Sequence, residues 1–196
     1  MSNFLTLPVE YSARHVHLSK KTISFLFGEN YQLTVKKNLS QPGHFAAEET
    51  VMLLGPKNSL KLRILGPERD HDQVELAKSD CLFVGIDAPL RLSGDVVASG
   101  AGKLIGPVGE FELKEGVIIA KRHLHCSAAT AEENHLKNGD SLSLEVEGER
   151  ALRFDEVIVR IHEGFEDTIH LDTDEANAAG LQEQGKLCKV FLNQEK

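Results

Sequence analysis

The residues of this chain best suited to chemistry are two His-X-His pairs, His15 with His17 and His123 with His125. In a β-strand, residues i and i+2 point to the same face and lie about 6.5–7 Å apart. Two imidazoles on one face can therefore converge on a single metal ion, and neutral imidazole is a good zinc ligand. One isolated pair could equally decorate a surface strand or sit hydrogen-bonded in a core. Two pairs favour metal binding.

Both pairs lie in the same local sequence. Residues 14–19 read RHVHLS and residues 122–127 read RHLHCS, an ungapped match at an offset of 108 residues. A looser echo relates Val74-Glu75-Leu76, followed by Ser79-Asp80-Cys81, to Ile169-His170-Leu171, followed by Asp174-Glu175-Ala176. The two echoes together predict two related units, each with one His-X-His pair and one further coordinating side chain.

Two ligands do not complete a metal site, and the candidates for the third are Glu75 and His170, both flanked by apolar residues. Three protein ligands with an open fourth position are typical of catalytic zinc. Glu75 could instead be a solvated strand glutamate, and His170 a histidine at the entry to a helix. Arg69 and Arg91 could bind phosphate through their guanidinium forks, or form ordinary surface ion pairs.

The remaining histidines and the cysteines lack such a context. The other four histidines considered are predicted to be surface residues: His44, His71, His135 and His162. Cys126 could offer a thiolate, but its place in the repeat corresponds to Leu18, which favours packing. Three widely spaced cysteines support neither a zinc ribbon nor a disulfide framework, and they fit a reducing compartment.

Short β-branched segments separated by Gly and Pro turns predict a mainly β fold of small barrels or sandwiches. The strands are expected at residues 31–35, 51–54, 61–65, 81–86, 116–120, 141–146 and 156–161. Three short helices are expected at residues 20–27, 128–136 and 174–181, the first two capped by Ser19 and Ser127.

Length and charge exclude several classes of protein. The 196 residues suit one large domain or two small ones, and 22 basic against 30 acidic residues give a net charge of −8. No run of Lys and Arg exceeds two residues, so a nucleic-acid or acidic-membrane binder is not expected. No apolar run approaches the ~20 residues that span a bilayer. Residues 1–8 are too short for a targeting helix, so we expect a cytoplasmic protein.

Six ordered motifs resemble the PduL-type phosphotransacylases, the phosphate propanoyltransferase family. They are SARHVHLS, QPGHFAAEE, LRILGPERDHDQVE, APLRLSGD, AKRHLHC and HLDTDEANAA, and the resemblance runs from about Val9 to Leu192. It implies two small antiparallel β-barrels related by internal duplication, with short capping helices. Residues 1–12 with 121–196 would form one barrel unit and residues 13–120 the other, with the active site between them.

The resemblance also implies two zinc ions per chain. One would be held by His15, His17 and Glu75, and the other by His123, His125 and His170. Arg69 would be the catalytic, phosphate-binding arginine, and Arg91 is a second phosphate candidate. Two residues, His44 and Asp72, depart from the family pattern. The carboxylate of Asp72 adds negative charge near the phosphate side, which would weaken phosphate binding.

The implied reaction converts a short-chain acyl-CoA (acetyl-CoA or propanoyl-CoA) and phosphate into acyl phosphate and CoA. Substrates rather than nucleic acid or membrane are the expected partners, and the family suggests a homo-oligomer, a dimer or larger. Two alternatives remain open from the residues. One is a di-zinc thioesterase or other hydrolase, and the other is a non-catalytic zinc-binding or anion-binding β-barrel module.

Overall fold

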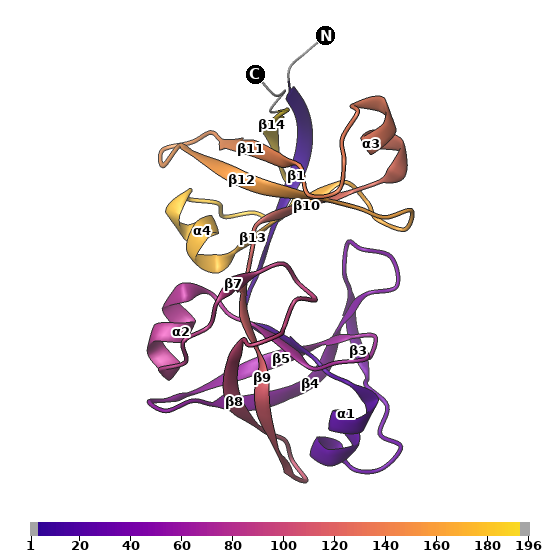
Figure 1. The fold of residues 1–196 in the computed structure, drawn as a ribbon, viewed down its shortest axis with the longest axis vertical. Coiled ribbons are helices and arrows are strands. Elements are labelled where there is room, and N and C mark those ends of the chain that lie inside the picture. The colour runs from indigo at the N-terminus through magenta and orange to yellow at the C-terminus, as the bar shows by residue number, and fades with distance from the viewer. Residues whose placement is uncertain (1–3, 193–196) are drawn as a thin grey trace. The chain divides into compact units, whose positions relative to one another are not determined.

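The computed structural model describes residues 4–192, and Met1–Asn3 of the N-terminal segment considered above lie outside the described residues. The chain divides into two compact units, Ala13–Ala120 and Met1–Ser12 with Lys121–Lys196. Each unit is a β-barrel with its own buried apolar core (Figure 1). The expectation of a mainly β fold of two barrels with short helices is confirmed.

The unit Ala13–Ala120 closes a ring of six strands in the order β4-β5-β2-β6-β9-β8, because β8 pairs with both β9 and β4. These strands are β2 (His15–His17), β4 (Phe45–Leu54), β5 (Ser59–Gly66), β6 (Gln73–Glu75), β8 (Gly100–Ile105) and β9 (Glu110–Ala120). Outside the ring, β3 (Val35–Asn38) pairs with β4 and β7 (Leu90–Arg91) pairs with β9. The helices of this unit are α1 (Lys20–Phe27) and α2 (Lys78–Val84).

The second unit is a closed six-stranded barrel in the order β1-β13-β10-β12-β11-β14. Its strands are β1 (Phe4–Ser12), β10 (His123–Cys126), β11 (Ser141–Val146), β12 (Leu152–Ile161), β13 (Thr168–Asp172) and β14 (Lys186–Phe191). Its helices are α3 (Ala128–Glu133) and α4 (Thr173–Ala178). The N-terminal strand β1 therefore closes the barrel made by the C-terminal part of the chain.

The two barrels share one topology. In both units the His-X-His strand has one parallel and one antiparallel neighbour. For β2 the parallel neighbour is β5 and the antiparallel one is β6. For β10 they are β12 and β13. Following the rings from there matches β9 with β1, β8 with β14 and β4 with β11. Each ring has four antiparallel pairs, as expected, and two parallel ones. The matching order supports the internal duplication.

Two local sequence predictions have contrasting outcomes. The helix at residues 20–27 is confirmed, with Ser19 accepting a hydrogen bond from the amide of Thr22 and Gly28 ending it. The strand expected at residues 81–86 is wrong, because Lys78–Val84 is helix α2. The apolar run misled because Cys81 and Val84, three residues apart, face the core while the side chains between them are exposed.

A third prediction fails for a different reason. The strand expected at residues 31–35 is displaced, since β3 covers Val35–Asn38 and is exposed along its whole length. Its residues carry no buried face, so hydrophobic alternation could not locate it. The register of an edge strand of this kind is decided by its partner, here β4.

A duplicated carboxylate fixes each His-X-His strand to the helix that follows it. Asp72 accepts hydrogen bonds from the amide of Ser19 at 2.7 Å and from the Thr22 hydroxyl at 2.6 Å. Asp167 accepts the equivalent bonds from Ser127 at 2.7 Å and from Thr130 at 2.5 Å. Asp72 is thus engaged at the N-terminus of α1, where negative charge is favoured.

A duplicated ion pair also ties the entry of each His-X-His strand to the second helix of its unit. Arg14 pairs with Asp80 of α2 at 2.5 Å, and Arg122 pairs with Glu175 of α4 at 2.7 Å. The looser sequence echo between residues 74–81 and 169–176 reflects this shared arrangement of strand, helix and carboxylate. Each pair is partly buried, so it restrains geometry more than a surface pair would.

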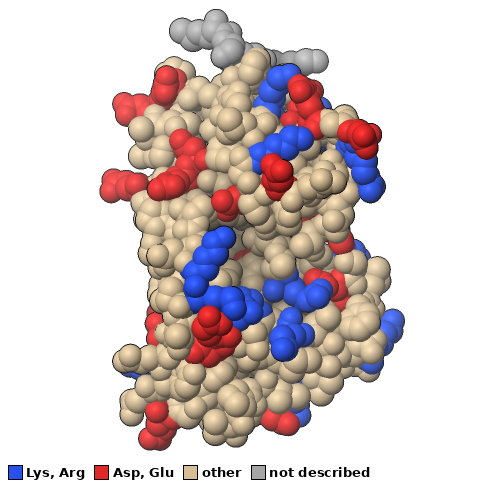
Figure 2. All heavy atoms as spheres, turned by 180° about the vertical axis from the view of Figure 1, so that it is seen from behind, with Lys and Arg blue, Asp and Glu red and all other residues tan. Residues whose placement is uncertain are grey.

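Charge on the surface is mixed. Figure 2 shows Lys and Arg in small groups with Asp and Glu among them on the visible face. Within residues 4–192, no helix combines the length and the apolarity needed to cross a membrane.

We predict that Asp167→Ala lowers the free energy of unfolding by about 1.5–3 kcal/mol, since hydrogen bonds to a charged group are lost at a helix start. Calorimetry and denaturant titration would measure it. Glu132→Ala, an exposed change on α3, is the matched control and should change stability by less than about 0.5 kcal/mol. Equal stabilities for the two variants would contradict the anchoring role of Asp167.

Candidate metal centres

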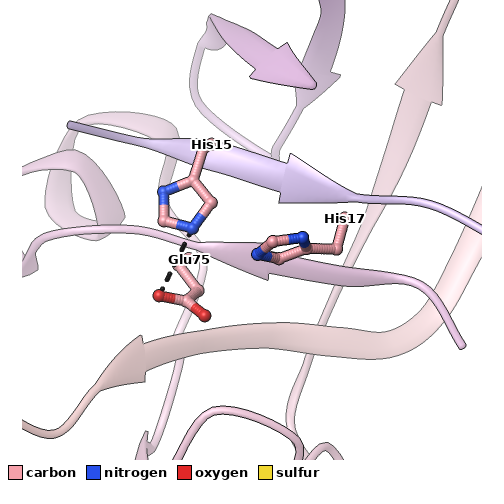
Figure 3. Close-up of side chains that lie close together, drawn as sticks. All are labelled: His15, His17 and Glu75. Carbon is pink, nitrogen blue, oxygen red and sulfur yellow. Dashed lines mark ion pairs between the residues drawn. The ribbon is translucent and has the colours of Figure 1, made fainter. Parts of the chain in front are cut away.

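The first centre lies on neighbouring strands β2 and β6. Their antiparallel register sets His15 directly opposite Glu75. The ligand atoms of His15, His17 and Glu75 all lie within 4.8 Å of one another. Figure 3 shows the two imidazoles and the carboxylate turned toward one another from the two strands. The strand geometry expected of His-X-His is therefore present, and Glu75 joins the pair.

The hydrogen bonding of His15 leaves one ring nitrogen available to a metal ion. Nδ1 of His15 donates to the carbonyl oxygen of Ala13 at 2.8 Å, so in the neutral ring Nε2 carries the lone pair. That Nε2 lies 3.4 Å from Oε2 of Glu75. Two ligand atoms on a tetrahedral zinc with bonds of about 2.0–2.1 Å would lie about 3.3 Å apart. The spacing fits a shared metal ion.

His17 supplies an independent test of fit. Its Nδ1 is buried and has no hydrogen-bond partner within residues 4–192, which is costly for a polar atom unless something binds it. Burial lowers the pKa of His17 well below its usual value, and electrostatic interactions with His15 and with the charge of Arg69 act in the same direction. The ring is thus neutral, as a metal ligand must be.

The second centre repeats this plan with a third imidazole. His123 stands opposite His170 in the register of β10 and β13, and its Nδ1 donates to the carbonyl oxygen of Lys121 at 2.8 Å. Nε2 of His123 lies 3.1 Å from Nε2 of His125. The ring centroid of His170 lies 5.3 Å from that of His123 and 4.6 Å from that of His125. All three imidazoles gather at one place.

The arginine candidates occupy different surroundings. The backbone of Arg69 is fixed beside the end of β2, where its amide donates to the carbonyl oxygen of Leu18 at 3.0 Å. Its charge helps to lower the pKa of both His17 and His44. Arg91 ends β7 and forms an ion pair with Asp95 at 3.6 Å.

Of the other histidines, His71, His135 and His162 are exposed as expected. His44 is half-buried, and the prediction that it is a surface residue is wrong in this respect. Burial, and secondarily the charge of Arg69, lowers its pKa. The turn that carries it is held by hydrogen bonds to Leu39 and Gln41, which bring residue 44 back toward the barrel.

Cys126 is a core residue. It is fully buried in the apolar cluster of its barrel, and burial raises the pKa of its thiol to about 11. A protonated thiol is a poor zinc ligand. Leu18, its counterpart in the repeat, is buried in the core of the other barrel, so the packing interpretation holds.

Sequence reasoning missed two residues of the first centre, Gln73 and Ser93. Both hydrogen-bond to Glu75, as described below. Gln73 lies directly opposite His17 in the pairing of β2 with β6. The sequence signal that could have identified Gln73 is its position two residues before Glu75 in the motif DQVE. Ser93 follows β7 and could be associated with Glu75 only through the folded structure.

Comparison with known proteins identifies the family of the chain. A family model described as phosphate propanoyltransferase matches residues 8–182. Proteins named phosphate propanoyltransferase from Shewanella putrefaciens and Priestia megaterium are 46% and 47% identical to the chain. The alignments cover 95% and 97% of the chain, and 89% and 88% of those proteins. One from Thermotoga maritima is 46% identical over 88% of the chain and 83% of its own length. The chain belongs to the phosphate propanoyltransferase family.

Proposed function

We propose that the chain catalyses the reaction of a short-chain acyl-CoA, propanoyl-CoA or acetyl-CoA, with phosphate to give acyl phosphate and CoA. The observation that carries the proposal is the convergence of His15, His17 and Glu75 in a chain of this family. In the reaction a phosphate oxygen attacks the thioester carbonyl carbon. The C–S bond then breaks and CoA leaves as the thiolate.

We propose zinc as the cofactor, two ions per chain. His15, His17 and Glu75 would hold one, and His123, His125 and His170 the other. When bound, zinc supplies a Lewis acid for a carbonyl oxygen and a soft acceptor for a thiolate. The buried Nδ1 of His17, the backbone hydrogen bonds that orient His15 and His123, and the close approach of the ligand atoms support this assignment.

The chain's own residues account for substrate positioning. Arg69 is proposed as the catalytic arginine that binds phosphate through two parallel hydrogen bonds. Its backbone amide is bonded to Leu18 just beyond β2, the strand that carries His15 and His17. Holding phosphate at a fixed position reduces the entropic part of the barrier for its attack. Arg91 is the second phosphate candidate.

Residues 4–12 form strand β1, which pairs with β14 along residues 4–9 and with β13 along residues 9–12. This segment is therefore not available as a separate targeting helix. We propose that the enzyme acts in the cytoplasm. A fusion of residues 1–14 to a fluorescent protein should stay diffuse in a host that assembles microcompartments, and discrete puncta that co-localise with their shells would contradict this.

We predict that purified protein carries about two zinc ions per chain, and that His17→Ala and His123→Ala each lose about one. Elemental analysis would measure this. His135→Asn is the control, since this exposed residue has a φ of 55°, which Asn tolerates. Protein without transition metal that retains full activity after dialysis against a chelator would contradict the zinc assignment.

Arg69→Ala is expected to raise the KM for phosphate about 10–100-fold, with a much smaller change in the KM for acyl-CoA. The reason is that a charge-assisted bidentate contact to one substrate contributes mainly to that substrate's binding. Steady-state kinetics with each substrate varied would show it. Arg91→Ala, measured in parallel, tests whether the second arginine shares the role. An unchanged KM for phosphate in folded Arg69→Ala protein would contradict a phosphate-binding role for Arg69.

Release of CoA from propanoyl-CoA or acetyl-CoA should require phosphate and yield one acyl phosphate per thiol. A thiol reagent and a hydroxamate assay for the acyl phosphate measure the two products. Release of CoA at the same rate without phosphate would indicate a thioesterase. No release under either condition would indicate a binding module.

A further inference from the structure

The carboxylate of Glu75 is held by a closed ring of hydrogen bonds. Nε2 of Gln73 donates to Oε1 of Glu75 at 2.6 Å and to Oγ of Ser93 at 2.8 Å. Oγ of Ser93 donates its proton to the same Oε1 at 2.8 Å. One carboxylate oxygen thus accepts two hydrogen bonds from neutral side chains.

The orientation of the Gln73 amide is fixed from its other end. The backbone amide of Gly94 donates to Oε1 of Gln73 at 2.7 Å, so the NH₂ group must face Glu75 and Ser93. Gln73 is fully buried, and a reversed amide would set its oxygen against a carboxylate. Gly94 has a φ of 104°, a backbone conformation that favours glycine. The turn after β7 is therefore attached to β6 both through the Gln73 amide and through the hydroxyl of Ser93.

Because the hydrogen bonds engage Oε1 of Glu75, the other carboxylate oxygen, Oε2, is the one available to a metal ion. Oε2 is the oxygen that lies 3.4 Å from Nε2 of His15, on the side of the first centre. A carboxylate whose other oxygen is engaged in this way is oriented to bind a metal ion through a single oxygen. Hydrogen bonds that orient a ligand in this manner typically change metal affinity 10–100-fold when they are lost.

In the second barrel the third residue is not a carboxylate, and the residue that corresponds to Gln73 cannot form the same ring of hydrogen bonds. There the third residue is His170, and Thr168 stands opposite His125 as Gln73 stands opposite His17. Threonine carries no amide that could bridge two partners. The two centres therefore differ in both the third ligand and its support.

We infer that Ser93 and Gln73 are positioning residues that make Glu75 a one-oxygen metal ligand. This inference rests on the proposed function, since it takes the first centre to bind zinc. It gives the motif APLRLSGD a role through its serine and its Ser-Gly turn. Ser93 acts through Glu75, and its loss alters the metal site while leaving the barrel intact.

The test is Ser93→Ala, with zinc affinity measured by competition with a chromophoric chelator. We expect one of the two zinc affinities to fall about 10–100-fold and the other to remain unchanged. Ser93→Thr keeps the hydroxyl and should restore the affinity. Ser99→Ala is the matched control in the same unit. Its hydroxyl contacts Val96 and Gly116 rather than Glu75, so both affinities should be unchanged.

The outcomes separate this inference from the proposed function. Wild-type protein that binds two zinc ions, with an unchanged affinity in Ser93→Ala, would overturn the inference alone. A raised phosphate KM at unchanged zinc affinity would likewise overturn it and assign the hydroxyl to substrate. Equal losses of zinc affinity in Ser93→Ala and Ser99→Ala would overturn the inference and indicate general destabilisation of the unit. Wild-type protein that takes up no zinc would overturn the zinc assignment and this inference together.

Discussion

The register between each His-X-His strand and its short antiparallel neighbour is the constraint on which the candidate sites depend. It sets Glu75 opposite His15 and His170 opposite His123. Side chains alternate between the two faces of a strand, so a slip of one residue would turn the third side chain away from the pair. The strands involved are only three to five residues long, and their own ladder is too short to specify the register.

The duplicated polar contacts supply what the short strands lack. Asp72 and Asp167 each precede the strand of the third ligand and bind the start of the helix after the His-X-His strand. The ion pairs of Arg14 and Arg122 fix the start of each His-X-His strand to the second helix of its unit, α2 or α4. Each centre is thus bounded by an acidic anchor on one side and an ion pair on the other, both built from residues of the repeat.

Duplication has preserved this frame while the chemistry of the two centres has diverged. One third ligand is a carboxylate with a dedicated hydrogen-bond ring, and the other is an imidazole stacked against its neighbour. A carboxylate carries charge and offers two oxygens, so it needs support that selects one of them. An imidazole is a rigid ring with a single lone pair in its neutral form, so there is no second donor atom to exclude.

The sequence by itself determined the parts that follow from local pattern. These are the two His-X-His pairs, the repeat that relates them, the mainly β class, and helix α1 between Ser19 and Gly28. Tertiary structure decided the rest. It made residues 78–84 a helix because only part of that apolar run is buried, and it closed a barrel with β1, about 160 residues from its partner β13 in sequence. It also brought Ser93 to Glu75, because a contact between separate turns and strands depends on the register of a closed sheet, which no local pattern encodes.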